Sequence, residues 1–234
     1  MEQETALQMS PVVVSSIAIV LLLAITLHEA AHAWVADKLG DPTPRSQGRV
    51  SLNPIRHISF FGTILVPTML ILSGTGLVFG WAKPVLVEPH RFKNPKTAMM
   101  DVALAGPAIN LLMAIIGCIG LGLFTQPDFS IDGGLKDATA IQSFFFFMIL
   151  INTVLAVFNM FPLPPLDGSK VLIGILPNAL ARPIAQMQGV GFGLLIALMI
   201  VPMAIPEAPN IIFGYVAYGT AAVLGFLFNL FGFA

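Results

Sequence analysis

The strongest chemical signal in this sequence is the pentapeptide HEAAH at residues 28–32. In a helix, residues four apart lie on one face, with about 5–6 Å between their Cβ atoms. The imidazoles of His28 and His32 could therefore bind one zinc ion at about 2.0–2.1 Å. Glu29 lies beside the first imidazole, where it could accept a proton from a water molecule that the zinc ion has acidified. The pattern predicts a catalytic centre with one Zn²⁺ ion, and two histidines that merely cap a helix end are the alternative.

A catalytic zinc site uses three protein ligands and keeps one position open, so a third ligand must come from elsewhere in the chain. Asp167 fits best, because it follows a proline-rich break in which a regular helix cannot continue. Gly168 beside it permits a close approach of the backbone to the site. The alternative for Asp167 is an Asp-Gly turn that caps the next helix. The full set of candidates is His57, His90, Asp101 and Asp167.

Two asparagines in apolar segments need a separate explanation. Asn159 stands at the start of the proline-rich break, where its amide could donate a hydrogen bond to a developing oxyanion. A hydrogen bond between helices is the alternative for this residue. Asn110 follows the small residues of AGPAIN at 105–110, which favour close helix packing, so we expect a structural role. His57 and His90 fall in basic loops, and we expect both on the surface.

These residues must be positioned by membrane helices. The 234-residue chain is 56% hydrophobic and only 10% charged, whereas soluble domains carry about 25% charged residues. The net charge of −1 gives no case for a nucleic-acid partner, and a lipid bilayer is the expected surrounding. A spanning helix needs roughly 20 apolar residues. The segments that qualify are 10–36, 100–124, 141–161, 188–205 and 211–232.

A further apolar stretch, 58–80, is interrupted by Pro67, Gly74 and Gly76. If it enters the membrane and returns to the same side, all lysines and arginines except Lys136 lie on one side. Because cytoplasmic loops are rich in Lys and Arg, that side is expected to be cytoplasmic. The N-terminus then lies outside the cell membrane and the active site lies near the cytoplasmic face. A full crossing by 58–80 would lose this segregation of charge.

The fold class that follows is an all-α integral membrane protein. We expect a polytopic bundle of about five to six transmembrane helices, with a re-entrant or short β element at 58–80. Residues 1–234 form a single membrane-embedded domain in this interpretation, with a catalytic core at about 10–172 and additional helices at about 188–232. The single cysteine, Cys118, excludes an internal disulfide. Nothing in the sequence indicates the oligomeric state.

The chain resembles the site-2 protease family of intramembrane zinc metalloproteases, and its compact, mainly prokaryotic subgroup in particular. The matching motifs occur in the family's order. They are HEAAH at 28–32, GRVSLNP at 48–54, FGWAKPV at 79–85, AGPAIN at 105–110 and NMFPLPPLDG at 159–168. The resemblance implies that His28, His32 and Asp167 hold zinc and that Glu29 is the catalytic base. It also implies that Asn159 steadies the substrate or the oxyanion.

The reaction expected from this resemblance is hydrolysis of peptide bonds within or near transmembrane segments of membrane protein substrates, as in regulated intramembrane proteolysis. A regular helix hides its carbonyl groups in internal hydrogen bonds, so the substrate must unwind before attack. The broken stretch 58–85 could assist by offering a strand edge to the unwound peptide. Trp81, Lys83 and Pro84 are therefore candidates for substrate binding, and an anchor at the membrane interface is the alternative for Trp81.

Two other classes of protein deserve comparison. A metal transporter or channel would carry polar residues along several helices, whereas 188–205 and 211–232 contain almost none. A catalytically silent protein that only holds membrane partners would not need Glu29, which is present. The sequence therefore favours a protease over both alternatives.

Overall fold

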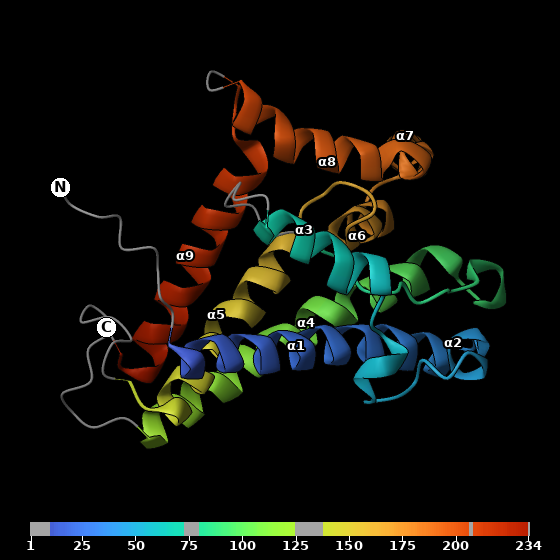
Figure 1. The fold of residues 1–234 in the computed structure, drawn as a ribbon. Coiled ribbons are helices and arrows are strands. Elements are labelled where there is room, and N and C mark those ends of the chain that lie inside the picture. The colour runs from blue at the N-terminus through green and yellow to red at the C-terminus, as the bar shows by residue number, and fades with distance from the viewer. Residues whose placement is uncertain (1–9, 73–79, 125–137, 206–207, 234) are drawn as a thin grey trace.

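The computed structural model describes residues 10–72, 80–124, 138–205 and 208–233. Within these ranges the chain is helical and contains no strand (Figure 1). The helices are α1 Pro11–Lys38, α2 Thr43–Ser46, α3 Val66–Leu72, α4 Pro95–Phe124, α5 Ala140–Asn159, α6 Asp167–Ile175, α7 Asn178–Gln186, α8 Gln188–Ala204 and α9 Ile211–Phe231. Three short helices complete the described fold, and they are η1 Pro54–Arg56, η2 Phe60–Leu65 and η3 Pro89–Arg91.

Four described helices are long and apolar enough to cross a membrane, namely α1, α4, α5 and α9. They contain 28, 30, 20 and 21 residues, and at about 1.5 Å per residue each reaches about 30 Å or more. Helices α7 and α8 are bent by 68° and form a fifth candidate span only when taken together. The polytopic all-α prediction is confirmed, with four to five spans where five to six were expected.

Local sequence signals account for the ends of the first span. The Ser10 hydroxyl accepts a hydrogen bond from the Val13 N–H at 3.3 Å, and Pro11 occupies the first helical position, where its missing N–H costs nothing. After Lys38 the chain turns at Gly40, whose φ of 111° suits glycine. Helix α1, Pro11–Lys38, therefore begins and ends within two residues of the apolar segment 10–36 expected from the sequence.

Helices α1, α4 and α5 pack against one another and form the centre of the molecule (Figure 1). Glycines on α4 allow the close approach of α5: a Cβ atom at Gly117 would lie 2.8 Å from Ile149 Cγ1. At Gly120 it would lie 2.2 Å from a ring carbon of Phe145. Small residues at helix contacts are the usual way to gain dispersion energy in a membrane, where lipid tails compete for apolar surface. Helix α9 adds Leu227 to the same buried cluster.

The broken stretch 58–80 begins as η2 and α3, and its residues 73–79 lie outside the described part of the chain. Its two ends are hydrogen-bonded to each other. The Trp81 N–H donates to the Gly62 carbonyl at 3.0 Å, and the Lys83 N–H donates to the His57 carbonyl at 2.8 Å. Because the ends lie together, the chain returns to the side from which it left, as the re-entrant prediction requires. The described residues contain no strand, so they do not support the alternative of a short β element.

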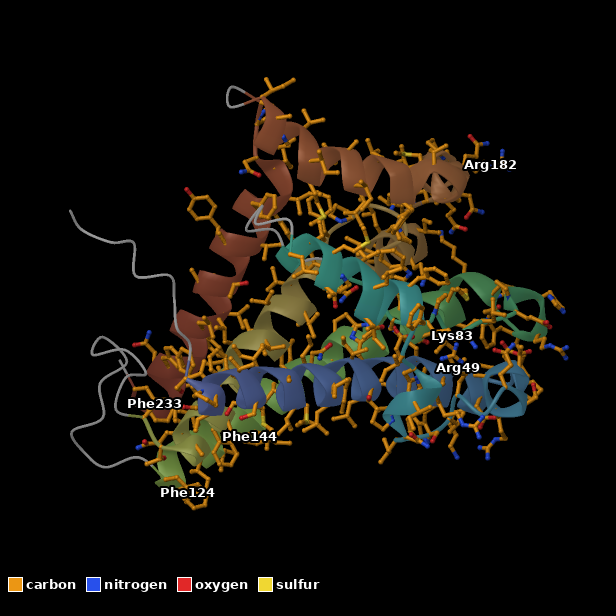
Figure 2. The ribbon with its side chains drawn as sticks, viewed as in Figure 1. Arg49, Lys83, Phe124, Phe144, Arg182 and Phe233 are labelled. Carbon is orange, nitrogen blue, oxygen red and sulfur yellow. The ribbon has the colours of Figure 1, made fainter. Side chains whose placement is uncertain are left out.

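The two ends of the molecule differ in the kind of side chain that they carry. Figure 2 shows Arg49, Lys83 and Arg182 at one end, while Phe124, Phe144 and Phe233 lie at the other. The loop that contains Lys136 falls outside the described residues. The described arrangement thus agrees with the predicted gathering of cations on one side. Between the two ends the exposed side chains include many large apolar residues of α1, α4 and α9, so the fold is that of a multi-pass membrane protein in a lipid environment.

Candidate metal centre

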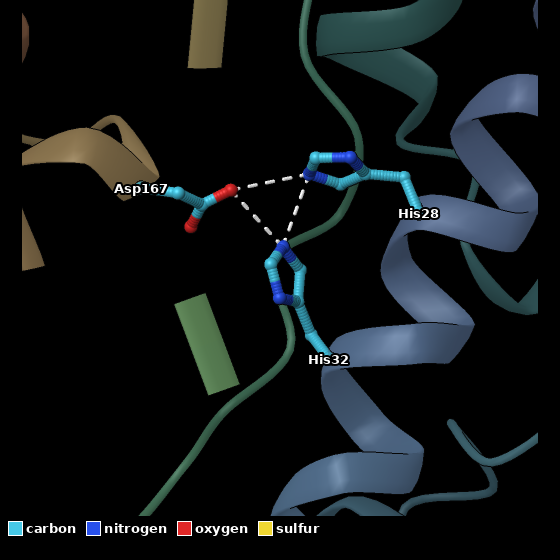
Figure 3. A group of neighbouring side chains, drawn as sticks. All are labelled: His28, His32 and Asp167. Carbon is cyan, nitrogen blue, oxygen red and sulfur yellow. Dashed lines mark hydrogen bonds and ion pairs between the residues drawn. The ribbon is translucent and has the colours of Figure 1, made fainter. Parts of the chain in front are cut away.

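Three side-chain atoms from distant parts of the chain meet between α1 and α6 (Figure 3). His28 Nε2 and His32 Nε2 lie 3.0 Å apart, and Asp167 Oδ2 lies 3.2 Å from the first and 3.1 Å from the second. The three residues are buried, with exposed fractions of 7%, 8% and 5%. Among the described residues, no other group of three or more His, Cys, Asp or Glu side chains could hold a metal ion. The other proposed third ligands, His57, His90 and Asp101, are not part of this group.

The protonation of His32 is fixed by its second ring nitrogen. His32 Nδ1 lies 2.6 Å from the backbone carbonyl oxygen of Val102 on α4. A carbonyl can only accept a hydrogen bond, so Nδ1 must carry the proton. The tautomer that results leaves an unprotonated lone pair on Nε2, which faces Asp167. This is the form of histidine that binds metal ions.

His28 is fixed in the same way by a longer chain of buried side chains. Its Nδ1 lies 2.6 Å from Asn110 Oδ1, Asn110 Nδ2 donates to Asn152 Oδ1 at 2.8 Å, and Asn152 Nδ2 donates to the Met148 carbonyl at 2.9 Å. The final carbonyl can only accept, so every hydrogen bond in the chain has a defined direction. We call these three side chains, His28, Asn110 and Asn152, the asparagine relay. It also leaves the lone pair of His28 Nε2 free.

This donor set fits a zinc ion. With the hydrogen of each neutral ring on Nδ1, three lone-pair atoms lie 3.0–3.2 Å from one another. Such an arrangement is unfavourable in a buried site unless a cation neutralises it. Tetrahedral zinc with ligands at about 2.0–2.1 Å separates neighbouring ligand atoms by about 3.3 Å. The observed spacing is close to that value, and two imidazoles with one carboxylate form an ordinary catalytic zinc set.

Gly106 of helix α4 packs directly against the two histidines of the centre. A Cβ atom at Gly106 would lie 2.5 Å from both His28 Cε1 and His32 Nε2. The sequence predicted only that the small residues of AGPAIN allow helix packing. The structure shows that the space left by Gly106 is filled by the two imidazoles themselves.

Asp167 reaches the centre because α5 ends at Asn159 and the chain runs without helix through 160–166. Gly168 allows this path, since a Cβ atom there would lie 2.2 Å from the Met160 carbonyl oxygen. Asp167 is the first residue of α6 and Leu166 is its N-cap, so Asp167 does not cap the helix. Its other carboxylate oxygen lies 3.4 Å from Lys170 Nζ.

A cavity of about 310 Å³ opens beside the three atoms. Glu29 and Asn159 both line it, and Asn159 Nδ2 donates to the Leu155 carbonyl at 3.0 Å. Pro84 lines the cavity as well, but Trp81 and Lys83 are not among its described lining residues. The Trp81 ring instead meets Phe192 of α8, with ring centroids 5.4 Å apart. The complete lining is His28, Glu29, His32, Pro84, Val85, Leu86, Val87, Met99, Val102, Asn159, Pro165, Asp167 and Lys170.

Three polar residues differ from their predicted roles or were not predicted at all. His57 is fully buried rather than on the surface, because the loop before it folds over the ring and Ser51 O lies 2.8 Å from its Nε2. Asn110 touches a site histidine directly, and Asn152 was not singled out at all. An asparagine inside a spanning helix is a costly residue, and that cost is the signal that could have marked Asn152.

Comparison with known proteins indicates the family of this chain. The model of "Peptidase family M50" matches residues 129–201. The "Putative zinc metalloprotease YwhC" of Bacillus subtilis (strain 168) is 38% identical over 185 residues, which cover 79% of this chain and 80% of that protein. The "Putative zinc metalloprotease Rip2" of Mycolicibacterium smegmatis is 28% identical over 183 residues, which cover 77% of this chain and 65% of that protein. No solved structure matches this chain significantly.

The membrane-spanning helices, the buried donor set and these relatives together identify a membrane zinc metalloprotease. The chain belongs to peptidase family M50, the site-2 proteases, as the extent of its identity with YwhC shows. Zinc is accordingly its metal cofactor, and His28, His32 and Asp167 form a site that could bind it.

Proposed function

We propose that this chain hydrolyses peptide bonds within or near the transmembrane segments of membrane protein substrates. The observation that carries the proposal is the shared cavity: the three possible ligands, Glu29 and Asn159 all line it. Residues 28 and 32 precede Lys38, the last residue of α1, by ten and six positions, or about 15 and 9 Å along the helix. A bond cut at this depth lies inside the substrate's membrane segment. The catalytic unit would comprise a core at 10–172 and the additional helices at 188–232.

The proposed chemistry divides among a few residues. His28, His32 and Asp167 hold the ion, and zinc when bound supplies Lewis acidity toward water and the scissile carbonyl. Glu29 accepts a proton from the attacking water and later gives it to the nitrogen of the leaving amine. Asn159 has a second amide hydrogen besides the one bonded to Leu155 O, and this hydrogen donates to the carbonyl oxygen as negative charge develops.

The substrate is proposed to bind as an added strand along residues 80–87, which have no helical structure. The backbone N–H and C=O groups of Val85, Leu86 and Val87 make no hydrogen bond within the described part of the chain, and all three residues line the cavity. An unwound peptide could pair with them. Pro84 borders the cavity, and Trp81 and Lys83 continue the same segment toward α8. All three are substrate-binding residues in this proposal.

The test is to compare the native chain with Glu29→Gln. General-base catalysis contributes about 10²–10⁴-fold, so cleavage of a model transmembrane substrate should fall at least a hundredfold. Bound zinc, measured by metal analysis, should be unchanged. Asp101→Asn is the control, because this exposed carboxylate of α4 lies outside the cavity lining, and it should cleave normally.

Two outcomes would contradict the proposal. One is a Glu29→Gln variant that cleaves as fast as the native chain. The other is a native chain that binds zinc and cleaves no membrane substrate, which would favour a metal transporter or a silent binding protein.

A further inference from the structure

Arg49 is a buried cation without a carboxylate partner. Its exposed fraction is 4%, and no ion pair to it is found within the described residues. Removing a guanidinium from water is costly unless hydrogen bonds replace the lost solvation. Burial lowers the pKa of Arg49 and the charge of Glu29 raises it, with burial the larger effect. Burying the Arg49 guanidinium therefore costs free energy, and its hydrogen bonds indicate what the residue does.

Those contacts are two backbone carbonyls. Arg49 Nη2 donates to the Pro84 carbonyl at 3.1 Å, and Nη1 donates to the Arg56 carbonyl. The latter directly precedes His57, whose own carbonyl accepts the Lys83 N–H. One guanidinium thus joins the beginning of the re-entrant stretch to the segment that follows it. Proline has no N–H, so its carbonyl is the only backbone group of Pro84 that can be held by a hydrogen bond.

The segment beyond Pro84 is held again four residues later. The Glu88 N–H donates to Asp41 Oδ2 at 2.7 Å, and Asp41 is fully buried at the end of the turn that follows α1. Between these two anchors lie Val85, Leu86 and Val87, with no backbone hydrogen bond in the described chain. Residues 85–87 are therefore fixed at both ends and leave an open backbone edge along the cavity that His28, His32 and Asp167 also line.

We propose that Arg49 is a positioning residue for substrate: by holding the Pro84 carbonyl it presents the open backbone edge of residues 85–87 to an extended peptide beside the metal centre. The inference rests on the proposed function and deepens it. Fixing an edge in advance removes an ordering cost that binding would otherwise bear. The planar guanidinium suits the task, because its rigid fork can reach two carbonyls at once, which a lysine ammonium does less well.

The experiment compares Arg49→Gln and Arg49→Lys with the native chain, using a model transmembrane substrate in mixed micelles. Losing a hydrogen bond from a charged donor should raise KM about tenfold for Arg49→Gln, with a smaller rise for Arg49→Lys. The zinc content should stay within about twofold, because Arg49 contacts none of the three possible ligands, and the loss of activity should appear mainly in KM. Arg45→Gln is the matched control, because that exposed arginine pairs with Asp37 and not with the edge.

A second measurement separates this inference from the proposed chemistry. A photo-crosslinker at Leu86, in a Glu29→Gln background, should capture the substrate peptide, and adding Arg49→Gln should abolish the capture. If Arg49→Gln leaves KM and crosslinking unchanged, or lowers only zinc content, the positioning role is wrong even though the proteolytic function stands. If Arg49→Gln does not fold, an Arg49→Lys variant with native KM also overturns it. Loss of cleavage in Glu29→Gln tests the proteolytic function alone.

Discussion

The geometry of individual side chains at the metal centre is set by hydrogen bonds that end on backbone carbonyls. Val102 O fixes the ring of His32, and Met148 O fixes the ring of His28 through the asparagine relay. Each ring thereby directs one lone pair toward Asp167. Because these bonds are buried, their strength is not diluted by competing water.

Asn110→Ala should weaken zinc binding. The substitution leaves the proton on His28 Nδ1 without an acceptor in a buried site and removes the donor to Asn152. Loss of such a partner behind a metal-binding histidine typically costs about 10–100-fold in affinity. Titration with a competing chelator measures the change. Asn229→Ala, which removes an exposed asparagine bonded to its own helix, is the control and should bind zinc normally.

At this scale the sequence predicted the meeting of His28, His32 and Asp167 better than the contacts that support these side chains. His28 and His32 share a fixed helical spacing, so their meeting needs only local geometry, and the proline-rich break pointed to Asp167. The contacts of Asn110 with Asn152 and of Val102 with His32 join different helices, and no spacing along the chain encodes them. They depend on the rotation of α4 and α5 relative to α1, which only packing determines.

At the scale of elements, helix α4 supports the candidate metal centre from one side. It contributes the Val102 carbonyl, Asn110 and the space at Gly106. Because these groups all come from one helix, a small shift of α4 would disturb both histidines together.

Gly106→Ala should therefore impair the centre severely. The added methyl would lie 2.5 Å from atoms of both imidazoles, much closer than real Cβ contacts. Forced overpacking costs about 1–3 kcal/mol, and here the strain falls on the zinc-binding atoms. We expect reduced zinc content by metal analysis and loss of cleavage. Gly122→Ala on the same helix is the control, since its methyl would lie an ordinary 3.4 Å from the nearest Phe233 atom.

Asp41 connects the end of α1 to the segment before η3, and it should make stability depend on pH. Burial alone would raise its pKa, but hydrogen bonds from Thr43 and Glu88 and the charge of Arg91 together hold the pKa below its ordinary value. A carboxyl group with a lowered folded-state pKa stabilises the fold above its unfolded pKa of about 3.9. That contribution is lost as pH falls through the folded-state pKa.

Asp41→Asn should consequently lower the free energy of unfolding at pH 7 by about 1–3 kcal/mol. The difference from the native chain should begin to shrink below about pH 4, where the unfolded chain binds a proton at Asp41. It should disappear once pH falls through the lowered folded-state pKa. Denaturant unfolding in detergent at several pH values measures both effects. Asp101→Asn, on the exposed face of α4, provides the comparison. A difference that persists unchanged at low pH would refute the electrostatic explanation.

The helices themselves were largely predictable, because long apolar runs end at clear caps. The segment 188–205 was the exception. It forms the 17-residue helix α8, which joins α7 at a 68° bend. Gly191 explains part of this arrangement: a Cβ atom there would lie 2.4 Å from the Pro164 carbonyl oxygen. Gly191 thus allows α8 to pack closely against the proline-rich break.

At the scale of the whole molecule, the gathering of cations at one end supports the proposed orientation, with the N-terminus outside and the metal centre near the cytoplasmic face. The single cysteine makes this testable, since Cys118 is fully buried and should not react with a label. Ser10 and Gln47 are exposed, the first just before the N-terminal end of α1 and the second beyond its C-terminal end. Ser10→Cys should react with an impermeant maleimide only from outside the cell, and Gln47→Cys only in inverted vesicles. The reverse pattern would show that the orientation is inverted.

The order of the ligands along the chain has a consequence for biosynthesis. His28 and His32 lie in the first helix, whereas Asp167 follows about 135 residues later, an interval of roughly 7–27 seconds at ribosomal speeds of about 5–20 residues per second. During that interval α1 is already available for insertion, yet the nascent chain lacks the carboxylate that completes the donor set. If the proposed function holds, a newly made copy cannot cleave membrane proteins near the translocon until most of its own bundle has been synthesised.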